Sequence, residues 1–371
     1  MAQHGIILLL FGPVLPEIMK TFEIGESLAG LMLGLGSLGF MAAPILAGTI
    51  ADRRGVRWSL LLGLIVEIGF LTLLGFSPFL WLATAAIMIL KFGAGFIETS
   101  LNVIPTLVRN ERPGSLMNLV HMFFSVGALA SPIIAGAILQ ATGSWRPVFW
   151  IAAAPTVLLL LAALRTRFPS NGHSGKLPSA GAAKSAMRAI LRNRSVLLGA
   201  AVLFLYVGAE IAVSDWIVLY LQKKLAFGTL ASTLGLSILW LGILAGRYLN
   251  SRLARQLSGK KLVLGAGALG LVSGLILLAV RTPVPAYLLL FVDGVAMSGI
   301  FPIVMAELNH RDPSLSGRVT GVLAVAASLG AVVFVPIVGA VAEWLGLTSA
   351  LAIPAVLMGA LGLLYLRVDE A

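Results

Sequence analysis

Three polar side chains interrupt a stretch, from about residue 81 to 108, that is otherwise apolar enough to span a membrane: Lys91, Glu98 and Asn102. On insertion scales a Lys or an acidic residue at the centre of a span costs about 2.5 to 3.5 kcal/mol, so two unpaired ones cost roughly 5 to 7 kcal/mol. The later two follow Lys91 by seven and eleven residues, close to two and three helical turns, so all three project from one face. We expect this face to look toward water or other helices, not toward lipid.

Glu98 is the member of this group best suited to carry a proton. Burial favours a neutral carboxyl, whereas contact with a cation or with water favours the carboxylate. Alternation between those environments would couple protonation to conformation. The competing interpretation is a structural ion pair with Lys91, although a separation of seven residues is long for a contact within one helix. Lys91 itself is expected either to pair with an acid across a cavity or to bind an anionic substrate.

The following apolar stretch carries Asn118, His121 and Ser125 at spacings of three and four, again on one helical face. The preceding loop, 107 to 114, is short, so the two stretches are expected to be antiparallel neighbours with Asn102 at a similar depth. One polar cluster is the predicted result. A histidine suits a proton relay because its side chain titrates near neutral pH, but a hydrogen-bonded packing histidine is the alternative.

The second half of the chain has its own intramembrane acids, Glu210, Asp215 and Asp293. Glu210 lies about 15 residues into its stretch, too deep to reach the surface easily. Asp215 is closer to the end, where water is expected to solvate it, and Asp293 is the predicted partner of Lys91 across the halves. The neighbouring Trp216 suits stacking on a sugar face or, equally, an interfacial aromatic belt.

Composition defines the elements that position these residues. The chain has 371 residues, of which 59% are hydrophobic and only 11% charged, against about a quarter charged in soluble domains. Apolar runs of bilayer-spanning length recur about twelve times. We therefore predict an all-α membrane protein with twelve transmembrane helices, arranged as two pseudo-symmetric six-helix bundles around a central cavity.

The basic residues have an asymmetric distribution. If both termini are cytoplasmic, nineteen Lys and Arg fall in inner loops and five on the outer side, with Lys91 and Arg247 within spans. This bias predicts that orientation in the membrane, and it explains the net charge of +11 without nucleic-acid binding. The chain has no cysteine and only four histidines, so we expect neither a disulfide framework nor a metal site, and no cofactor.

The predicted organisation is an amino-terminal bundle over residues 1–164, a basic cytoplasmic linker over 165–194 and a carboxy-terminal bundle over 195–371. The halves echo each other in SVGALASPIIAG from Ser125 and SLGAVVFVPIVG from Ser328, which indicates an internal duplication. Such halves commonly enclose a site near the membrane midplane. The first span begins almost at Met1, so we expect that a few residues of a longer natural helix are missing.

The loop GTIADRRGVR joins the second and third spans. Gly55 allows a tight reversal with positive φ, and Asp52, at the negative end of a helix dipole, is expected to need Arg53, Arg57 or another helix terminus as partner. This segment resembles the signature loop of the major facilitator superfamily, and the positions that match it are Gly48, Asp52, Arg53, Gly55 and Arg57. In that family the loop is taken to hold the halves together on the cytoplasmic side. The third span is usually peripheral in this fold, so Glu67 on it has no assigned role.

A narrower resemblance comes from GFIETSLN at Gly95, MNLVHMFFSVGALASP at Met117 and YVGAEIAVSDWIVLYL at Tyr206. Together these are similar to the fucose:proton symporter branch, in which a fourth-span carboxylate, matched here by Glu98, is implicated in proton coupling. That symporter also uses a first-span acid shortly before a proline. The residues before Pro16 here include no acid, so the substrate is not implied.

These features favour a proton-coupled secondary transporter of a small polar solute, a sugar or a related metabolite, over an enzyme, because we find neither a nucleophile with a base nor a metal cluster in the sequence. Glu98, His121 and Glu210 are the expected proton-coupling residues. The expected substrate-binding residues are Lys91, Asn102, Asn118, Trp216 and Asp293. Protons and the lipid bilayer are the other expected partners, and we expect a monomer in a bacterial inner membrane. A proton-driven efflux antiporter and a non-transporting sensor are the alternatives.

Overall fold

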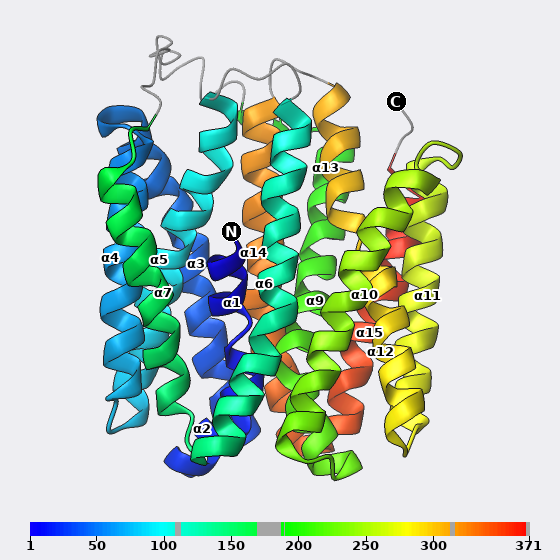
Figure 1. The fold of residues 1–371 in the computed structure, drawn as a ribbon. Helices are drawn as coiled ribbons and strands as arrows, with labels where there is room; N and C mark the ends of the chain where they lie inside the picture. The colour runs from blue at the N-terminus through cyan, green and yellow to red at the C-terminus, as the bar shows by residue number, and fades with distance from the viewer. Residues whose placement is uncertain (108–112, 169–186, 189, 312–315, 369–371) are drawn as a thin grey trace.

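The computed structural model describes the chain except residues 108–112, 169–186, 189, 312–315 and 369–371, and except the side chains at 106, 113–118, 311 and 316–317. The described residues form helices and turns, without a β-strand. The helices, shown in Figure 1, are α1 (Ala2–Leu8), α2 (Phe11–Phe22), α3 (Glu26–Arg54), α4 (Val56–Gly75), α5 (Leu80–Leu107), α6 (Pro113–Thr142), α7 (Arg146–Arg165), α9 (Arg194–Leu225), α10 (Thr229–Leu253), α11 (Gly259–Ala279), α12 (Pro283–Met297), α13 (Ile300–Arg311), α14 (Ser316–Leu345) and α15 (Leu347–Tyr365).

Twelve helical segments in the described part are long and apolar enough to cross a membrane, as the sequence predicted. Two of them are broken, because α1 with α2 forms the first span and α12 with α13 forms the tenth. Each break lies four residues before a proline, at Leu9 before Pro13 and at Ser298 before Pro302. A proline ring clashes with the carbonyl four residues earlier and offers it no N–H, which explains both interruptions.

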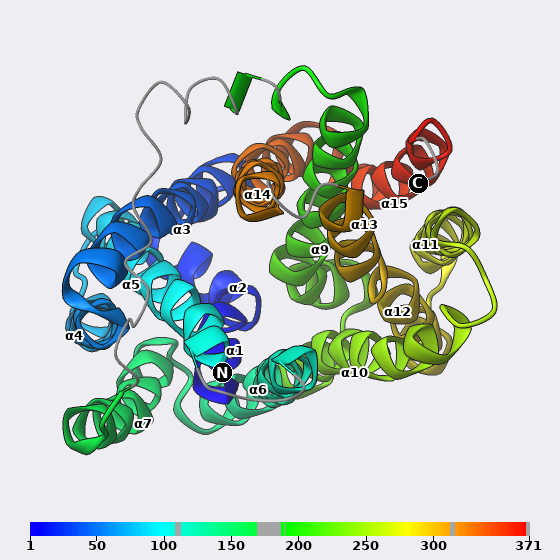
Figure 2. The same cartoon turned by 90° about the horizontal axis from the view of Figure 1, so that it is seen from above.

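The helices form two six-span bundles, α1 to α7 and α9 to α15, which Figure 2 shows side by side. The bundles meet along α3 with α14, α6 with α10 and α2 with α9. If the second span, α3, is matched with the eighth, α10, and the fifth, α6, with the eleventh, α14, the seam of α3 with α14 maps onto the seam of α10 with α6. The predicted pseudo-symmetry is therefore confirmed, and the echoing segments occupy corresponding helices, α6 and α14.

Glycines let the bundles approach closely at both long seams. A Cβ placed on Gly34 of α3 would lie 2.3 Å from Cγ of Pro336 on α14. A Cβ on Gly136 of α6 would lie 2.1 Å from Oγ1 of Thr233 on α10. Small residues allow such backbone approach between membrane helices, so these positions define how tightly the interface between the bundles can close.

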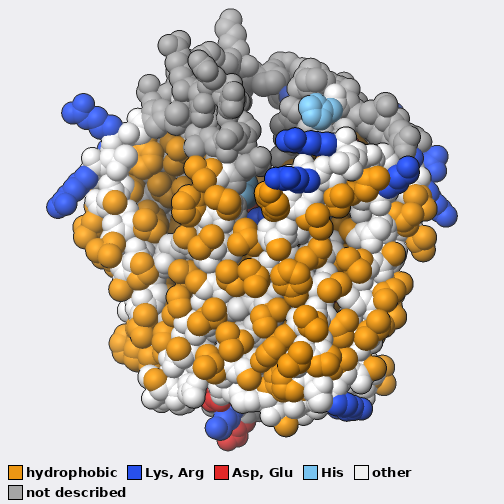
Figure 3. Space-filling view, turned by 45° about the vertical axis from the view of Figure 1, so that its right-hand side comes forward, with side chains coloured by type: hydrophobic (Ala, Val, Ile, Leu, Met, Phe, Trp, Pro, Cys, Tyr) orange, Lys and Arg blue, Asp and Glu red, His pale blue; other side chains and the backbone are white. Residues whose placement is uncertain are grey.

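The periphery of the molecule is apolar. Large hydrophobic side chains on peripheral helices are strongly exposed, among them Ile45, Leu158 and Leu363. Figure 3 shows this apolar surface as a broad band, with Lys and Arg side chains gathered at its rims. A lipid-facing belt between two polar rims is the surface expected of a multi-pass membrane protein, and the polar residues inside it must be accommodated by the bundle interface.

One end of the molecule is closed by contacts between the bundles. We call the end at which α7 stops and α9 starts the linker face, and the opposite end the far face (Figure 1). At the far face Lys223 Nζ lies 2.8 Å from Oε1 of Glu26, and the backbone N–H of Ser27 donates to Oε2 of Glu343 at 2.7 Å. Both contacts join the first bundle to the second.

Candidate functional site

Glu98 on α5 contacts His4 on α1, with His4 Nε2 and Glu98 Oε2 3.3 Å apart. The His4 side chain is 1% exposed, whereas that of Glu98 is 34% exposed. His4 also lies against the ring of Phe124 on α6, at 5.8 Å between ring centroids. An imidazole beside a carboxylate can share and exchange one proton, and here the carboxylate keeps access to water while the imidazole does not.

Arg247 on α10 connects this group of residues to the second bundle. Its Nη1 donates to Ser125 Oγ at 2.6 Å and to the carbonyl oxygen of His121 at 3.3 Å, both on α6. The charge of Arg247 acts on the His121 side chain and on Glu210 of α9. The guanidinium is therefore placed between the titratable groups of the two bundles.

Glu210 is buried, at 9% exposure, and accepts a hydrogen bond from the Tyr206 hydroxyl at 2.8 Å. On the other side of the interface, the charge of His121 acts on Glu98. We call His4, Glu98, His121, Arg247 and Glu210 the histidine cluster. It combines two acids with three basic residues from both bundles, an arrangement in which the charge on one bundle depends on the protonation of the other.

Lys91 lies two turns from Glu98, about 10 Å closer to the far face. It is 5% exposed, and its Nζ is 4.8 Å from the centroid of the Phe11 ring on α2. The acid whose charge acts on Lys91 is Asp215 of α9, which is itself only 4% exposed. The expectation that Asp293 pairs with Lys91 is therefore wrong. The expectation that Asp215 is solvated is also wrong, because helix packing turns Asp215 inward.

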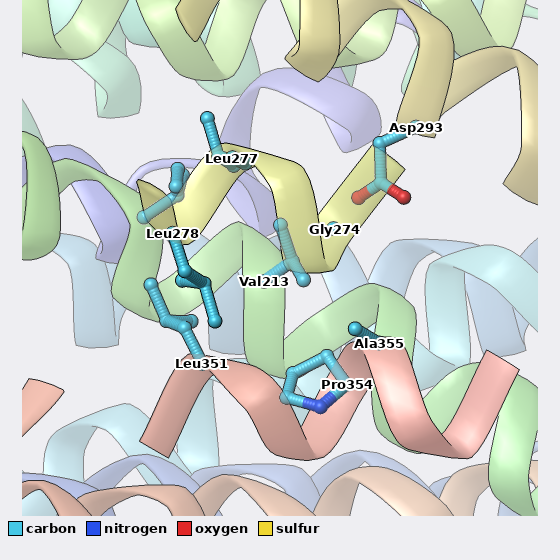
Figure 4. Close-up of a pocket in the computed structure, with 9 residues that line it drawn as sticks. Val213, Gly274, Leu277, Leu278, Asp293, Leu351, Pro354 and Ala355 are labelled. Carbon is cyan, nitrogen blue, oxygen red and sulfur yellow. The ribbon is translucent and has the colours of Figure 1, made fainter. Parts of the chain in front are cut away.

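Asp293 lies inside the second bundle. Its Oδ1 accepts from Ser273 Oγ at 3.1 Å, and it borders a small pocket lined otherwise by apolar residues. Figure 4 shows its carboxyl group facing Gly274, with Val213 and Pro354 nearby. The pocket is formed by α9, α11, α12 and α15, so Asp293 faces the centre of its own bundle and not the interface between the bundles.

Glu67 is the corresponding buried acid of the first bundle, at 1% exposure. The Thr156 hydroxyl of α7 donates to its Oε1 at 3.4 Å, and Gln3 of α1 donates to Thr156 Oγ1 at 3.0 Å. This network ties α1 to α4 and α7. Glu67, which the sequence left unassigned, therefore helps to position the residue next to His4.

The remaining predicted binding residues are dispersed. Trp216 is fully buried, and its Nε1 donates to the Val335 carbonyl oxygen of α14 at 3.2 Å, so its ring is not at an interfacial surface. Asn102 is partly buried, and its Oδ1 has no hydrogen-bond partner. The Asn118 side chain lies outside the described residues. The structure thus brings Lys91, Glu98 and His121 to the interface but leaves the asparagine cluster a prediction.

The loop after α3 has the predicted geometry. Gly55 ends α3 with φ +93°, a conformation that favours glycine. Arg57 Nη2 donates to the Leu164 carbonyl oxygen of α7 at 2.7 Å, within the first bundle. Asp52 is exposed and, in the described part of the chain, forms no ion pair. The predicted pairing of Asp52 with Arg53 or Arg57 is therefore wrong, because water can solvate this carboxylate.

His4, Arg247 and Tyr206 were not predicted from the sequence to belong to the site. His4 precedes the helix break of the first span, so its depth was not apparent from hydropathy. Arg247 could have been found, since an arginine inside a predicted span already indicates an inward-facing function. Tyr206 is one turn before Glu210, the spacing of side chains that meet on a helix face.

Two pseudo-symmetric six-span bundles with a titratable cluster on their interface define a membrane transport protein and not an enzyme. The chain belongs to the Major Facilitator Superfamily, whose family model matches residues 4–323. The resemblance predicted from the loop after α3 is thereby confirmed.

Named relatives agree with this assignment. The chain is 23% identical to a putative glucose/galactose transporter of Helicobacter pylori, over 93% of this chain and 88% of that protein. Its fold is similar to that of a D-xylose-proton symporter, with a TM-score of 0.82, 16% identity and coverage of 100% and 97% of the two chains. The Escherichia coli fucose:proton symporter is also similar, with a TM-score of 0.67, 17% identity and coverage of 100% and 98%.

Proposed function

We propose that this protein is a proton-coupled secondary transporter that moves a small polar solute, of the sugar class, across a bacterial inner membrane by alternating access. The glucose/galactose relative supports the solute class, and the symporter folds support coupled transport. The single observation that carries the proposal is the His4 to Glu98 contact of 3.3 Å at the interface between the bundles.

The histidine cluster supports coupling through its connections. Water that reaches Glu98 can deliver a proton, and protonation removes the negative charge of the carboxylate that contacts His4 Nε2. His4 lies on the short broken segment α1, and Glu98 on α5. A proton therefore changes how α1 is held in the first bundle, while Arg247 transmits the change in charge toward Glu210. Such a difference between protonated and deprotonated states can shift a conformational equilibrium.

The proposed orientation places the linker face, at which α15 ends, in the cytoplasm, because most basic residues fall in loops on that side. In this orientation the contacts of Glu26 with Lys223 and of Ser27 with Glu343 close the periplasmic end. Side-chain exposure falls from 34% at Glu98 to 5% at Lys91, which supports access from the cytoplasmic side in this conformation.

Reconstituted liposomes test the proposal. Purified protein would be given labelled D-glucose, D-galactose and D-xylose, with and without an inward proton gradient. We expect a gradient to drive accumulation of at least one sugar. Glu98→Gln should abolish this accumulation, because the amide cannot take up a proton, but should spare exchange of internal for external sugar. Unchanged accumulation in Glu98→Gln would refute Glu98 as the coupling residue.

Glu23→Gln is the control, since it neutralises an exposed acid of the same bundle that forms no ion pair among the described residues. We expect it to retain gradient-driven accumulation. If a proton gradient drives sugar out of loaded liposomes and never inward, the protein is an antiporter and the proposed direction of coupling is wrong.

A further inference from the structure

We propose that Lys91 and Asp215 form a solute subsite that takes one hydroxyl group of a neutral polyhydroxy solute, with the hydroxyl oxygen accepting from Lys91 Nζ and its proton donated to Asp215 Oδ2. The inference rests on the proposed function and deepens it, because it names the residues that recognise the solute and the kind of solute that they select. It is independent of how the proton is carried by the histidine cluster.

The Lys91 side chain is held in place by helices of the first bundle. Gly36 of α3 leaves room for its stem, since a Cβ there would lie 3.2 Å from Lys91 Cδ. The Phe11 ring of α2 covers the ammonium group at 4.8 Å from the ring centroid. Asp215 comes from α9 of the second bundle. A Cβ on Gly12, which follows Phe11, would lie 2.2 Å from the carbonyl oxygen of Ser214, which precedes Asp215. The two charged groups therefore lie near the same contact of α2 with α9, one from each bundle.

Both groups lack the partners that burial demands. Asp215 Oδ2 is buried without a hydrogen-bond partner. Among the described residues, Lys91 forms no hydrogen bond and no ion pair within 4.0 Å, although Asp215 is the acid whose charge acts on it. A buried ammonium and a buried carboxylate that do not touch are unfavourable. A small polar group between them would satisfy both.

A hydroxyl group fits this gap better than an ion does. The subsite offers one cationic donor and one anionic acceptor, and a hydroxyl can accept from the first while it donates to the second. An anion would be repelled by Asp215 and a cation by Lys91, because each would meet a like charge at low exposure. The subsite therefore selects uncharged solutes, and the adjoining Phe11 ring suits the apolar edge of such a molecule.

The position between the bundles gives the subsite a role in closure. Lys91 and Asp215 are 5% and 4% exposed here, on the far-face side of Glu98. A hydroxyl that binds both would link the first bundle to the second only when the bundles are close at this level. Solute binding would thereby favour the closed interface, which is the differential affinity that a population shift requires.

The test measures sugar exchange in liposomes without a proton gradient. The probes are D-glucose, D-galactose and D-xylose, together with the monodeoxy forms of whichever sugar the wild type carries. Lys91→Met and Asp215→Asn should each raise KM about 10- to 100-fold, the range expected for a lost hydrogen bond to a charged group. In the wild type, one deoxy position should cause a loss of similar size. That loss should shrink in Asp215→Asn, and to less than about twofold in the double variant Lys91→Met with Asp215→Asn, because both partners of the hydroxyl are then absent.

Lys224→Met is the matched control, since it removes an exposed lysine at the far face, and it should leave KM unchanged. Lys91→Arg and Asp215→Glu keep the charges; each should fold and should show a KM between those of the wild type and the neutral variants. An unchanged KM in both neutral variants overturns the proposal. A deoxy penalty that is equal in the wild type and in Asp215→Asn also overturns it. So does transport of glycine or alanine, in place of sugars, that requires both Lys91 and Asp215.

The proposed function fails by a different result. If wild-type liposomes exchange sugar and the deoxy penalty depends on Asp215, but a proton gradient drives no accumulation, the subsite is supported and proton coupling is refuted.

Discussion

Two groups of charged residues lie on the interface between the bundles, and they differ in whether their acids contact a hydrogen-bond partner. In the histidine cluster, Glu98 contacts His4 at 3.3 Å, Arg247 donates to Ser125 at 2.6 Å, and Glu210 accepts from Tyr206 at 2.8 Å. About 10 Å away along α5, Lys91 and Asp215 are 5% and 4% exposed and do not touch.

This difference separates two tasks. Groups that already contact acids and bases, and that water can reach, can exchange a proton without any other ligand. Buried charges with an unused donor and an unused acceptor are arranged for a molecule that arrives. We therefore infer that proton coupling and solute recognition occupy successive levels of one interface. Glu98 and Lys91, which lie on the same helix, connect the two levels.

The largest expected effect comes from removing Arg247. Arg247→Ala should lower sugar exchange by about 10- to 100-fold, because it removes the hydrogen bonds from a charged group that join α10 to Ser125 and to the His121 carbonyl oxygen, each worth about 1.5 to 3 kcal/mol. Exchange in liposomes is the measurement. Arg252→Ala, an exposed arginine of the same helix that contacts Tyr248, should have little effect. Wild-type exchange in Arg247→Ala would show that the histidine cluster does not depend on the second bundle.

A smaller effect concerns the stability of the Lys91 and Asp215 pair. Lys91→Met alone should lower the thermal unfolding midpoint in detergent, since it leaves an uncompensated buried carboxylate. Adding Asp215→Asn should raise the midpoint again and bring the free energy of unfolding to within about 1 kcal/mol of the wild-type value, because no unpaired charge remains. The double variant should still show a raised KM for sugar. If the single variant is already as stable as the wild type, the two charges do not interact through the interface.

The smallest expected effect is at the far face. The Glu26 to Lys223 ion pair is partly exposed, with Lys223 50% accessible, so Glu26→Gln should shift the conformational equilibrium by only about 0.2 to 1 kcal/mol. The chain has no cysteine, so Lys20→Cys with Lys224→Cys gives a clean pair for spin labels. The labels should show a larger fraction of long distances in Glu26→Gln. Glu23→Gln, which removes an exposed acid that forms no ion pair in the described residues, should show the wild-type distribution.

Much of the architecture was accessible from the sequence because the bilayer constrains it strongly. A membrane span must satisfy the hydrogen-bonding groups of its own backbone and must be apolar over about 20 residues. The twelve helices were therefore predictable from hydropathy. The turn at Gly55 was predictable from the same local reasoning, because it depends on the backbone conformation of one residue, whose φ is +93°. The face that carries Lys91 and Glu98 was predictable from helical periodicity.

The partners across helices could not be predicted in the same way. Asp293 and Asp215 are both acids within spans of the second half, and nothing in their spacing from Lys91 tells which one faces it. The structure decides this, because α9 turns Asp215 toward the interface while Asp293 faces Ser273 inside its bundle. His4 was missed for a related reason, since the break before Pro13 separates α1 from the rest of its span.

By itself, the sequence determined the number of spans, the duplication, the tight turn after α3 and the placing of ionisable residues on inward faces. Each of these depends on hydrophobic length, periodicity or the local backbone, which short segments specify. Only the tertiary structure decided that Glu98 contacts His4, that Arg247 joins the bundles and that Lys91 faces Asp215 across a gap. Those contacts depend on the rotation and closeness of helices that are far apart in the chain, which the packing of glycine-lined seams fixes and no single segment encodes.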